Sequence, residues 1–272
     1  NKTNNPEVIF YRPGGEDKSI ESNNGPLGFS GDNLGKGRTL PTQNLVDAFP
    51  MKDGMFAGQG SKYTLNQSNP YENRDPRLDY TILHHGSSWL NNTLDISIGG
   101  VNNPSNSAEY SKTGYYMCKF MGKFGEESQY GNKIHLWVMF RYAEMLLNYA
   151  EAVYERDDKI SNTDLNISLN LVRLRVNPAM TPLTNELITQ NAGMDMRTEI
   201  RRERTIELFN EGFRLDDLKR WKTAETEMPM DIVGIQWKGT EYEKVWANCP
   251  YETNAEGCII IEKGRKWEEK NY

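Results

Sequence analysis

Apolar positions dominate residues 134–158, which read IHLWVMFRYAEMLLNYAEAVYERDD. The polar residues inside this run follow one another at steps of three, four, three and four: Arg141, Glu144, Asn148, Glu151 and Glu155. Because positions three or four apart share one side of an α-helix, these residues form a single polar stripe. The pattern predicts a helix whose remaining circumference is buried.

A second helix is expected after a polar turn. It would begin near Thr163 as N-cap and stop before Pro178, since proline cannot continue a helix. Between these limits lies a regular apolar seam: Leu165, Leu169, Val172 and Val176. The two helices together predict an antiparallel hairpin.

Two further helices are expected downstream. One covers 195–211 and ends at Gly212, where a left-handed cap is favoured. The other runs from Phe213 to about Ala224 and has Asp216 four residues before Arg220, a favourable spacing for an ion pair.

The apolar positions of the 195–211 helix do not collect on one face. Neighbours would then touch it from several sides, so some of its charged residues would be buried and paired. These are Arg201, Arg202, Glu203, Arg204 and Glu207. A solvated, salt-bridged helix is the alternative, whereas the interleaved glutamates disfavour nucleic-acid binding.

The first 133 residues have a different character, with 17 of the 23 glycines and eight of the 12 prolines. Such a segment cannot hold long helices. We expect a loop-rich region over 1–133 with short strands at 7–11, 78–83 and 115–120, followed by a helical region over 134–272. The expected fold class is mainly α, a helical hairpin packed with a loop-rich region that contains a few short strands.

Charge and composition narrow the function. The chain carries 32 Lys+Arg against 38 Asp+Glu, a net charge of −6, which excludes a basic nucleic-acid-wrapping protein. The sequence contains no run of about 18 apolar residues, so we expect no membrane span. The chain begins at Asn1 without a signal segment, so we expect a processed or truncated polypeptide.

Cys249 and Cys258 flank a short polar loop and are expected to be bridged, while Cys118 stands alone.

Motifs for catalysis or metal binding are missing from the sequence. His84, His85 and His135 fit no zinc or di-iron pattern, and we expect no catalytic residue, metal or cofactor. Glu144 and Glu151 would lie about 10 Å apart along one helix and are expected to form internal ion pairs, for example Arg141 with Glu144, rather than a glycosidase pair.

The segment NPYENRDPRLDY, residues 69–80, concentrates charged residues around two prolines. Asn-Pro and Asp-Pro are turn formers, so we interpret it as a structural turn clamped by ion pairs. A cation or phosphate site is the alternative.

Trp89 stands in the polar segment HHGSSWLNNT. An indole there could be a core side chain, or a flat platform on which a sugar ring stacks. For the second case the expected hydroxyl partners are Asn91, Asn92, His84 and His85. If Trp89 is not the platform, the next loop aromatics to test are Tyr71, Tyr80 and Tyr110.

Several segments, in this order, resemble the SusD/RagB family of outer-membrane nutrient-binding lipoproteins. They are LPTQNLVDAFPMKDG, YENRDPRLDYTIL, GYYMCKF, RYAEMLLNYAEA, LNLVRLR and IRRERTIELFNEGFRLDDLKRWK. The most specific pieces are RYAEMLLNYAEA at 141–152 and RRERTIELFNEGFR at 201–214, the latter with Asn210 and Phe213 where Ala and His are more usual.

The resemblance implies a surface-exposed lipoprotein of the outer membrane, mostly α-helical, with tetratricopeptide-like hairpins supporting a loop-rich face. Such proteins sit on a TonB-dependent transporter of the SusC type and capture oligosaccharides, polysaccharides or sometimes peptides without cleaving them. This chain resembles the C-terminal portion, with one hairpin at about 134–177 and without the lipid anchor. The alternatives are a glycosidase-type enzyme and a helical-repeat adaptor for proteins.

Overall fold

The computed structural model describes residues 5–97, 100–102, 111–240, 243 and 252–264. The chain forms two compact units, each assembled from three segments: unit 1 from 1–15, 48–78 and 134–212, and unit 2 from 16–47, 79–133 and 213–272. Of the described residues, helix accounts for 33% and strand for 17%, which agrees with the expected excess of helix. The division of the sequence at residue 133 stays a prediction.

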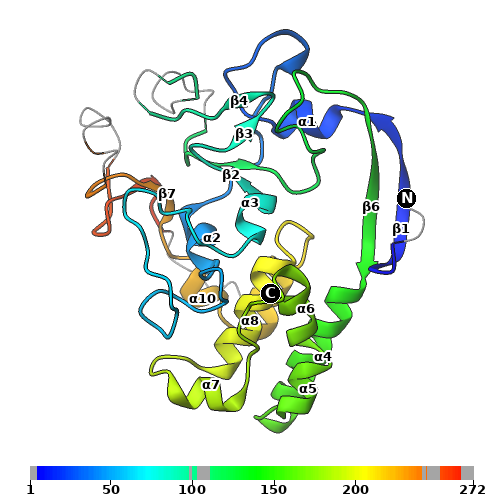
Figure 1. The fold of residues 1–272 in the computed structure, drawn as a ribbon, viewed down its shortest axis with the longest axis vertical. Coiled ribbons are helices and arrows are strands. Elements are labelled where there is room, and N and C mark those ends of the chain that lie inside the picture. Colours follow the sequence, from blue (N-terminus) through cyan, green and yellow to red (C-terminus); the bar gives the residue numbers. More distant parts are fainter. Residues whose placement is uncertain (1–4, 98–99, 103–110, 241–242, 244–251, 265–272) are drawn as a thin grey trace, which may run out of the picture. The chain divides into compact units, whose positions relative to one another are not determined.

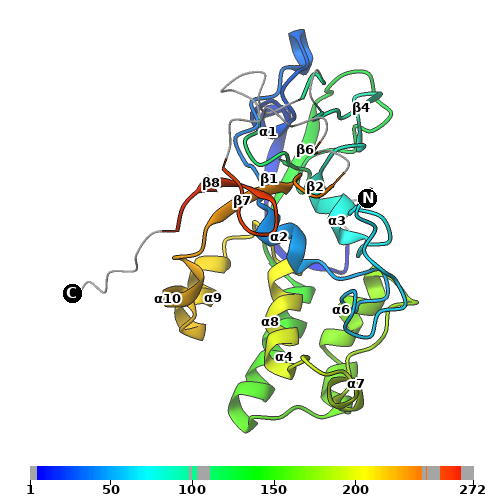
Figure 2. The ribbon, with the colours of Figure 1, turned by 90° about the vertical axis from the view of Figure 1, so that its left-hand side faces the viewer.

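Unit 1 is mainly helical and has one long pair of strands. The helix α4 contacts both α6 and α8, and Figure 2 shows these three helices together. Leu147, Leu169 and Ile200, one from each helix, are buried between them and their surroundings. The elements of this unit are β1 (Val8–Asp17), β6 (Lys133–Arg141), α4 (Tyr142–Asp157), α5 (Asn162–Asn166), α6 (Leu169–Val176), α7 (Asn185–Gln190) and α8 (Met196–Glu207).

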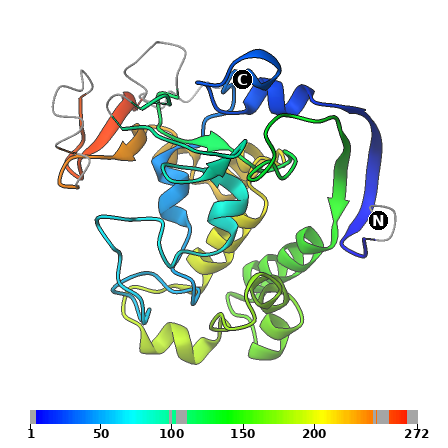
Figure 3. The ribbon, with the colours of Figure 1, turned by 45° about the horizontal axis from the view of Figure 1, so that its top comes forward.

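The helix expected over 134–158 is only partly present. Residues up to Arg141 form the strand β6, which pairs with β1 and leads directly into α4 (Figures 1 and 3). The amide N–H of Tyr142 bonds the carbonyl oxygen of Glu7, and Gly14 lies against the backbone of His135, so the two strands run antiparallel. A continuous apolar run does not distinguish strand from helix, and the aromatic and β-branched side chains before Arg141 favour the strand.

The predicted hairpin is present, but its second arm is divided. Ser161, not Thr163, caps α5, because its hydroxyl accepts a hydrogen bond from the N–H of Asp164 at 3.0 Å. The helix is interrupted at Ile167 and Ser168, and α6 then ends at Val176, before Pro178 as expected. The likeness of this hairpin to a tetratricopeptide repeat stays a prediction.

The helix α8 is shorter than its predicted range of 195–211. Asp195 caps it, accepting a hydrogen bond from the N–H of Thr198 at 2.9 Å, and it ends at Glu207. Gly212 has the expected positive φ of +91°, but it lies beyond the end of the helix.

The charged residues of α8 form the predicted buried network. Within unit 1, Arg77 Nη1 donates to Glu203 Oε1 at 2.5 Å and to Glu207 Oε2 at 3.1 Å. Arg141 Nη1 donates to Glu207 Oε1 at 2.7 Å, and Glu203 is fully buried. The alternative of a solvated helix is therefore wrong, although Arg201 stays partly exposed beside Glu155.

The ion-paired turn predicted at 69–80 is also confirmed. Asp75 Oδ2 accepts a hydrogen bond from Arg77 Nη2 at 2.7 Å, and Arg74 donates to the carbonyl oxygens of Phe49 and Pro70. These contacts fix the turn, so Arg74, Asp75 and Arg77 are paired within the protein.

Unit 2 is built from short elements joined by loops. The strands pair two by two: β2 with β5, β3 with β4, and β7 with β8, all antiparallel. The elements are α1 (Ser19–Asn24), the 3₁₀ helix η2 (Gly31–Asn33), α2 (Gln43–Ala48), α3 (Arg77–Thr81), β2 (Ile82–Leu83), β3 (Ser88–Trp89), β4 (Asn92–Thr93), β5 (Tyr116–Met117), α9 (Arg214–Trp221), α10 (Ala224–Glu227), β7 (Ile232–Gln236) and β8 (Cys258–Glu262).

Three details of the sequence-based expectations change in unit 2. The strand expected at 78–83 is mostly the helix α3, and only Ile82 and Leu83 are extended. Arg220 pairs with Asp217, three residues earlier, rather than with Asp216. Cys258 is a buried free thiol, while its expected partner Cys249 lies outside the described residues. In the part of the chain that the structure describes, no helix is long and apolar enough to cross a membrane.

Candidate functional site

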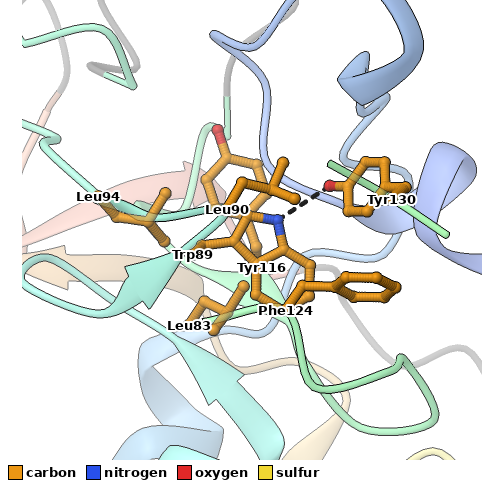
Figure 4. Packing of buried hydrophobic residues seen from close by; sticks show 7 residues of the cluster. All are labelled: Leu83, Trp89, Leu90, Leu94, Tyr116, Phe124 and Tyr130. Carbon is orange, nitrogen blue, oxygen red and sulfur yellow. Dashed lines mark hydrogen bonds between the residues drawn. The ribbon is translucent and has the colours of Figure 1, made fainter. Parts of the chain in front are cut away.

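Trp89 is a core residue. Its side chain is only 2% exposed, and its indole N–H donates to the Tyr130 hydroxyl at 2.9 Å (Figure 4). The rings of Phe124 and Tyr130 contact it edge-on at centroid distances of 5.7 Å and 6.0 Å. The expectation of an exposed sugar platform at this position is therefore wrong, and the core alternative is correct.

The hairpin of β3 and β4 explains this burial. Successive strand residues point to opposite faces, so Ser88 is exposed while Trp89 points into the cluster. Leu90 and Asn91 occupy the turn with φ of 50° and 54°, the left-handed pair that a tight two-residue hairpin requires. Leu90 is buried as well, which anchors the turn to the core although leucine rarely adopts this conformation.

Asn91 and Asn92 lie at the tip of this hairpin. Both residues are exposed, and the Asn92 side chain donates to the carbonyl oxygen of Leu90 at 2.7 Å. The Asn91 amide is available to a ligand, while that of Asn92 is partly used to hold the turn.

His84 and His85 lie at the other end of the hairpin, before β3. His84 Nε2 is 3.0 Å from Asp79 Oδ1, and its Nδ1 is 2.8 Å from the carbonyl oxygen of His85. His85 Nδ1 accepts a hydrogen bond from the N–H of Ile96 at 3.3 Å. The structure therefore does not bring the predicted residues into one cluster around Trp89: two lie at the base of the hairpin and two at its tip.

Asp95 completes the surroundings of His85, whose Nδ1 is 3.8 Å from Asp95 Oδ1. Burial raises the pKa of Asp95, but hydrogen bonds from Ser97 and the nearby His85 outweigh this, so the pKa is lowered overall. The carboxylate is consequently ionised near neutral pH and is an acceptor for hydroxyl groups.

An exposed tyrosine follows Asp79, the residue that contacts His84. Tyr80, next to Asp79 in α3, is 68% exposed. The carbonyl oxygen of Thr81 accepts hydrogen bonds from the N–H groups of Cys118 and Lys119, so the chain just after β5 lies alongside the end of α3. Phe120 there is 40% exposed. We call Asp79, Tyr80, His84, Lys119 and Phe120 the Tyr80 patch.

The Tyr80 patch has the chemistry that was expected around Trp89. It combines exposed aromatic rings with a carboxylate that is 70% exposed and an imidazole oriented by two oxygen atoms. From the sequence, Tyr80 is named only among the aromatics to test after Trp89, and a strand is expected over 78–83 where the structure has the helix α3. Of the other two aromatics, Tyr71 is buried and Tyr110 lies outside the described residues.

Of the two glutamates of α4, Glu151 is buried and Glu144 is partly exposed. Glu151 is 5% exposed, and its Oε2 lies 4.0 Å from Arg204 Nε. Burial raises the pKa of Glu144, against the opposing charge of Arg204. The predicted role as an ion-pair partner is confirmed for Glu151, whose partner is Arg204. Arg141, the expected partner of Glu144, donates hydrogen bonds to Glu207 and Glu211. Across the described residues, no three His, Cys, Asp or Glu side chains are grouped so as to hold a metal ion.

Comparisons with known proteins identify relatives of the chain. A SusD-like carbohydrate binding protein from Bacteroides fragilis NCTC 9343 is 28% identical and superposes with a TM-score of 0.73, over 97% of this chain and 50% of that one. A second SusD-like protein from the same strain is 26% identical, with a TM-score of 0.68 over 98% of this chain and 50% of its own. No curated protein matches.

The chain thus spans about half the length of these relatives. The model of the SusD family matches residues 6–256, which includes nearly every element of both units. The chain therefore belongs to the SusD family.

Proposed function

We propose that this chain is part of a cell-surface protein that captures oligosaccharides or polysaccharides without cleaving them and passes them to a SusC-like TonB-dependent transporter. The observation that carries the proposal is the relative described as a SusD-like carbohydrate binding protein, which is 28% identical over 97% of this chain. A lipid anchor outside this chain would hold the protein on the outer membrane, and the hairpin of α4 to α6 would serve as a tetratricopeptide-like support.

Within the described residues we assign the ligand contact to the Tyr80 patch. A sugar ring presents a face of C–H groups to an aromatic ring, and Tyr80 offers such a ring with a polar tip. Asp79 accepts hydrogen bonds from hydroxyl groups, and His84 is held in a fixed orientation beside it. The predicted contributions of Asn91, Asn92 and His85 would then come from the rim.

One incubation experiment distinguishes glycan binding from glycan cleavage. The protein is mixed with a panel of oligosaccharides, and both retention and new reducing ends are measured. Retention without new reducing ends supports the proposal, while release of products indicates the glycosidase alternative and contradicts it.

The assignment to the Tyr80 patch is tested by Tyr80→Ala. Loss of a central aromatic contact commonly costs more than ~2 kcal/mol, about thirtyfold in affinity. The matched control is Tyr142→Ala, which removes a half-exposed tyrosine from α4. Calorimetric titration with a retained glycan should show weakened binding for Tyr80→Ala only. Equal affinities for both variants would remove the Tyr80 patch from the site but leave glycan binding itself intact.

A further inference from the structure

Phe120 adopts a backbone conformation that aromatic residues rarely take. Its φ is +72°, in the left-handed region where a bulky side chain crowds the backbone. Most of the other described residues with positive φ, glycine apart, are asparagine or aspartate, which tolerate this region. An aromatic residue with this φ is therefore a site of backbone strain.

Phe120 occupies the third position of a β-turn. The N–H of Met121 donates to the carbonyl oxygen of Cys118 at 3.1 Å, which closes the turn over Lys119 and Phe120. Lys119 is not among the residues with positive φ, so the turn is of type II, and the third position of such a turn favours glycine. Phenylalanine there costs conformational free energy that glycine would not cost.

Burial offsets a cost of this kind at Leu90 but only partly at Phe120. Leu90, with a φ of +50°, is 1% exposed within the cluster around Trp89. Phe120 is 40% exposed, although Cys118 and Met121, the two ends of its turn, pack against that cluster. The chain therefore keeps an exposed aromatic ring where the backbone favours glycine. Strained residues of this kind concentrate at functional sites.

Phe120 lies near Tyr80 in space. The carbonyl oxygen of Thr81, the residue after Tyr80, accepts a hydrogen bond from the N–H of Lys119, the residue before Phe120, at 3.2 Å. Because consecutive Cα atoms are ~3.8 Å apart, the Cα atoms of Tyr80 and Phe120 lie within about 15 Å of each other. Lys119 Nζ is 5.5 Å from the centroid of the Phe120 ring, a cation–π contact that supports the ring and leaves it partly exposed.

We propose that Phe120 is a ligand-contacting residue and that the Tyr80 patch takes two sugar rings of one oligosaccharide, one on Tyr80 and a neighbouring one on Phe120. Each exposed aromatic ring offers a flat apolar surface to the C–H face of a sugar. This role rests on the proposed function, glycan binding at the Tyr80 patch. Only an oligosaccharide contacts both rings, so the site prefers it to the constituent monosaccharide.

Phe120→Gly and Phe120→Ala test the backbone strain separately from binding. Both variants remove the aromatic ring, but only glycine adopts a positive φ without cost. The urea midpoint of Phe120→Gly should therefore be higher than that of Phe120→Ala, which is the reverse of the usual order for these two residues. A lower midpoint for Phe120→Gly would show that the turn carries no strain and would contradict the proposal.

Calorimetric titration with trisaccharides tests the contact itself. The probes are maltotriose, cellotriose, xylotriose and mannotriose, each compared with its own monosaccharide. The original chain should bind at least one trisaccharide at least tenfold more tightly than the monosaccharide, and both Phe120 variants should lose that gain. Phe10→Ala is the matched control and should keep the gain, because Phe10 is a phenylalanine 59% exposed in unit 1, outside the Tyr80 patch.

The possible results separate this role from the proposed function. A trisaccharide whose binding is weakened by Tyr80→Ala but unchanged in both Phe120 variants would overturn the role of Phe120 and leave glycan binding intact. Equal affinity of the original chain for every trisaccharide and its monosaccharide would overturn the two-ring site. Binding of none of the four trisaccharides would count against glycan binding itself, and the two-ring site would fall with it.

Discussion

The indole N–H of Trp89 donates a hydrogen bond to the hydroxyl of Tyr130 at 2.9 Å, inside the core of unit 2. Burial raises the pKa of Tyr130 to about 12, with a smaller contribution from Glu21, so the phenol stays protonated at neutral pH. This hydrogen bond gives a partner to the indole nitrogen, the one polar atom of the Trp89 side chain. The rest of the indole is surrounded by aromatic and aliphatic groups (Figure 4).

This relationship predicts the effect of two substitutions. Trp89→Ala should lower the free energy of unfolding by ~3–5 kcal/mol, because it leaves a large cavity. Tyr130→Phe should cost ~1–3 kcal/mol, because the buried indole N–H loses its acceptor. Urea midpoints measure both effects. Tyr80→Ala, at an exposed position, is the control and should change stability by less than about 0.5 kcal/mol. Equal midpoints for Trp89→Ala and Tyr80→Ala would show that the indole is not a core residue.

The buried network of unit 1 predicts a contrast between two glutamates. Glu203 is fully buried between Arg77 and Arg173, so Glu203→Ala leaves buried positive charge and should cost ~3–5 kcal/mol. Glu155 pairs with Arg197 and Arg201 on a partly exposed surface, so Glu155→Ala should cost less than about 1 kcal/mol. Denaturant midpoints of the two variants measure these losses in the free energy of unfolding. Similar small losses for both variants would indicate that α8 is a solvated helix.

The same network makes the free energy of unfolding depend on pH in the acidic range. Burial raises the pKa of Glu207, but the charges of Arg77, Arg141 and Arg175 outweigh this and hold the pKa well below its ordinary value. A carboxylate with a lower pKa in the folded state contributes stability that is fully present above its unfolded pKa of about 4.3 and is lost as the pH falls below it. Urea midpoints should therefore fall between about pH 4.5 and pH 3.

Glu207→Gln provides the control for this acid dependence. The variant is less stable at pH 7, because the three arginines lose a charged partner, but its midpoint should decline less steeply below about pH 4.5. Equal slopes for the variant and the original chain would assign the acid dependence to other carboxylates.

The sequence predicted some of these features and not others, for physical reasons. The scattered apolar positions of α8 required neighbours on several sides, which is why the buried network could be predicted. Its partners could not, because Arg77 is 126 residues from Glu203 and Arg141 is 66 residues from Glu207, and only the tertiary fold brings them together. The strand β6 was missed because an apolar run fits either element.

The candidate site was harder to predict than the fold. Trp89 has polar neighbours in sequence, but the two-residue strand β3 and the turn at Leu90 point its indole into the core. That turn lacks the glycine that usually signals a tight hairpin. Tyr80 is the converse case: the sequence predicts a strand at this position, whereas the structure has the helix α3 and an exposed tyrosine.

Cys118 gives a prediction about the edge of the Tyr80 patch. Burial, with a smaller contribution from the nearby carboxylate of Asp79, raises the pKa of its thiol to about 11. Because the thiolate is the reactive form, Cys118 in the folded protein should react with a thiol reagent at pH 8 roughly two orders of magnitude more slowly than in denaturant, and faster as the pH rises.

Asp79→Asn tests the cause of this slow reaction. The substitution removes a negative charge that disfavours the thiolate, so the pKa of Cys118 should fall and its reaction at pH 8 should accelerate. Mass spectrometry of the modified peptide assigns the rate to Cys118, and Cys118→Ser confirms the assignment by abolishing it. A rate in the folded protein that matches the denatured one would mean that the thiol is open to solvent. A slow rate unchanged by Asp79→Asn would leave burial as the sole cause and place the Asp79 carboxylate too far away to influence the thiol.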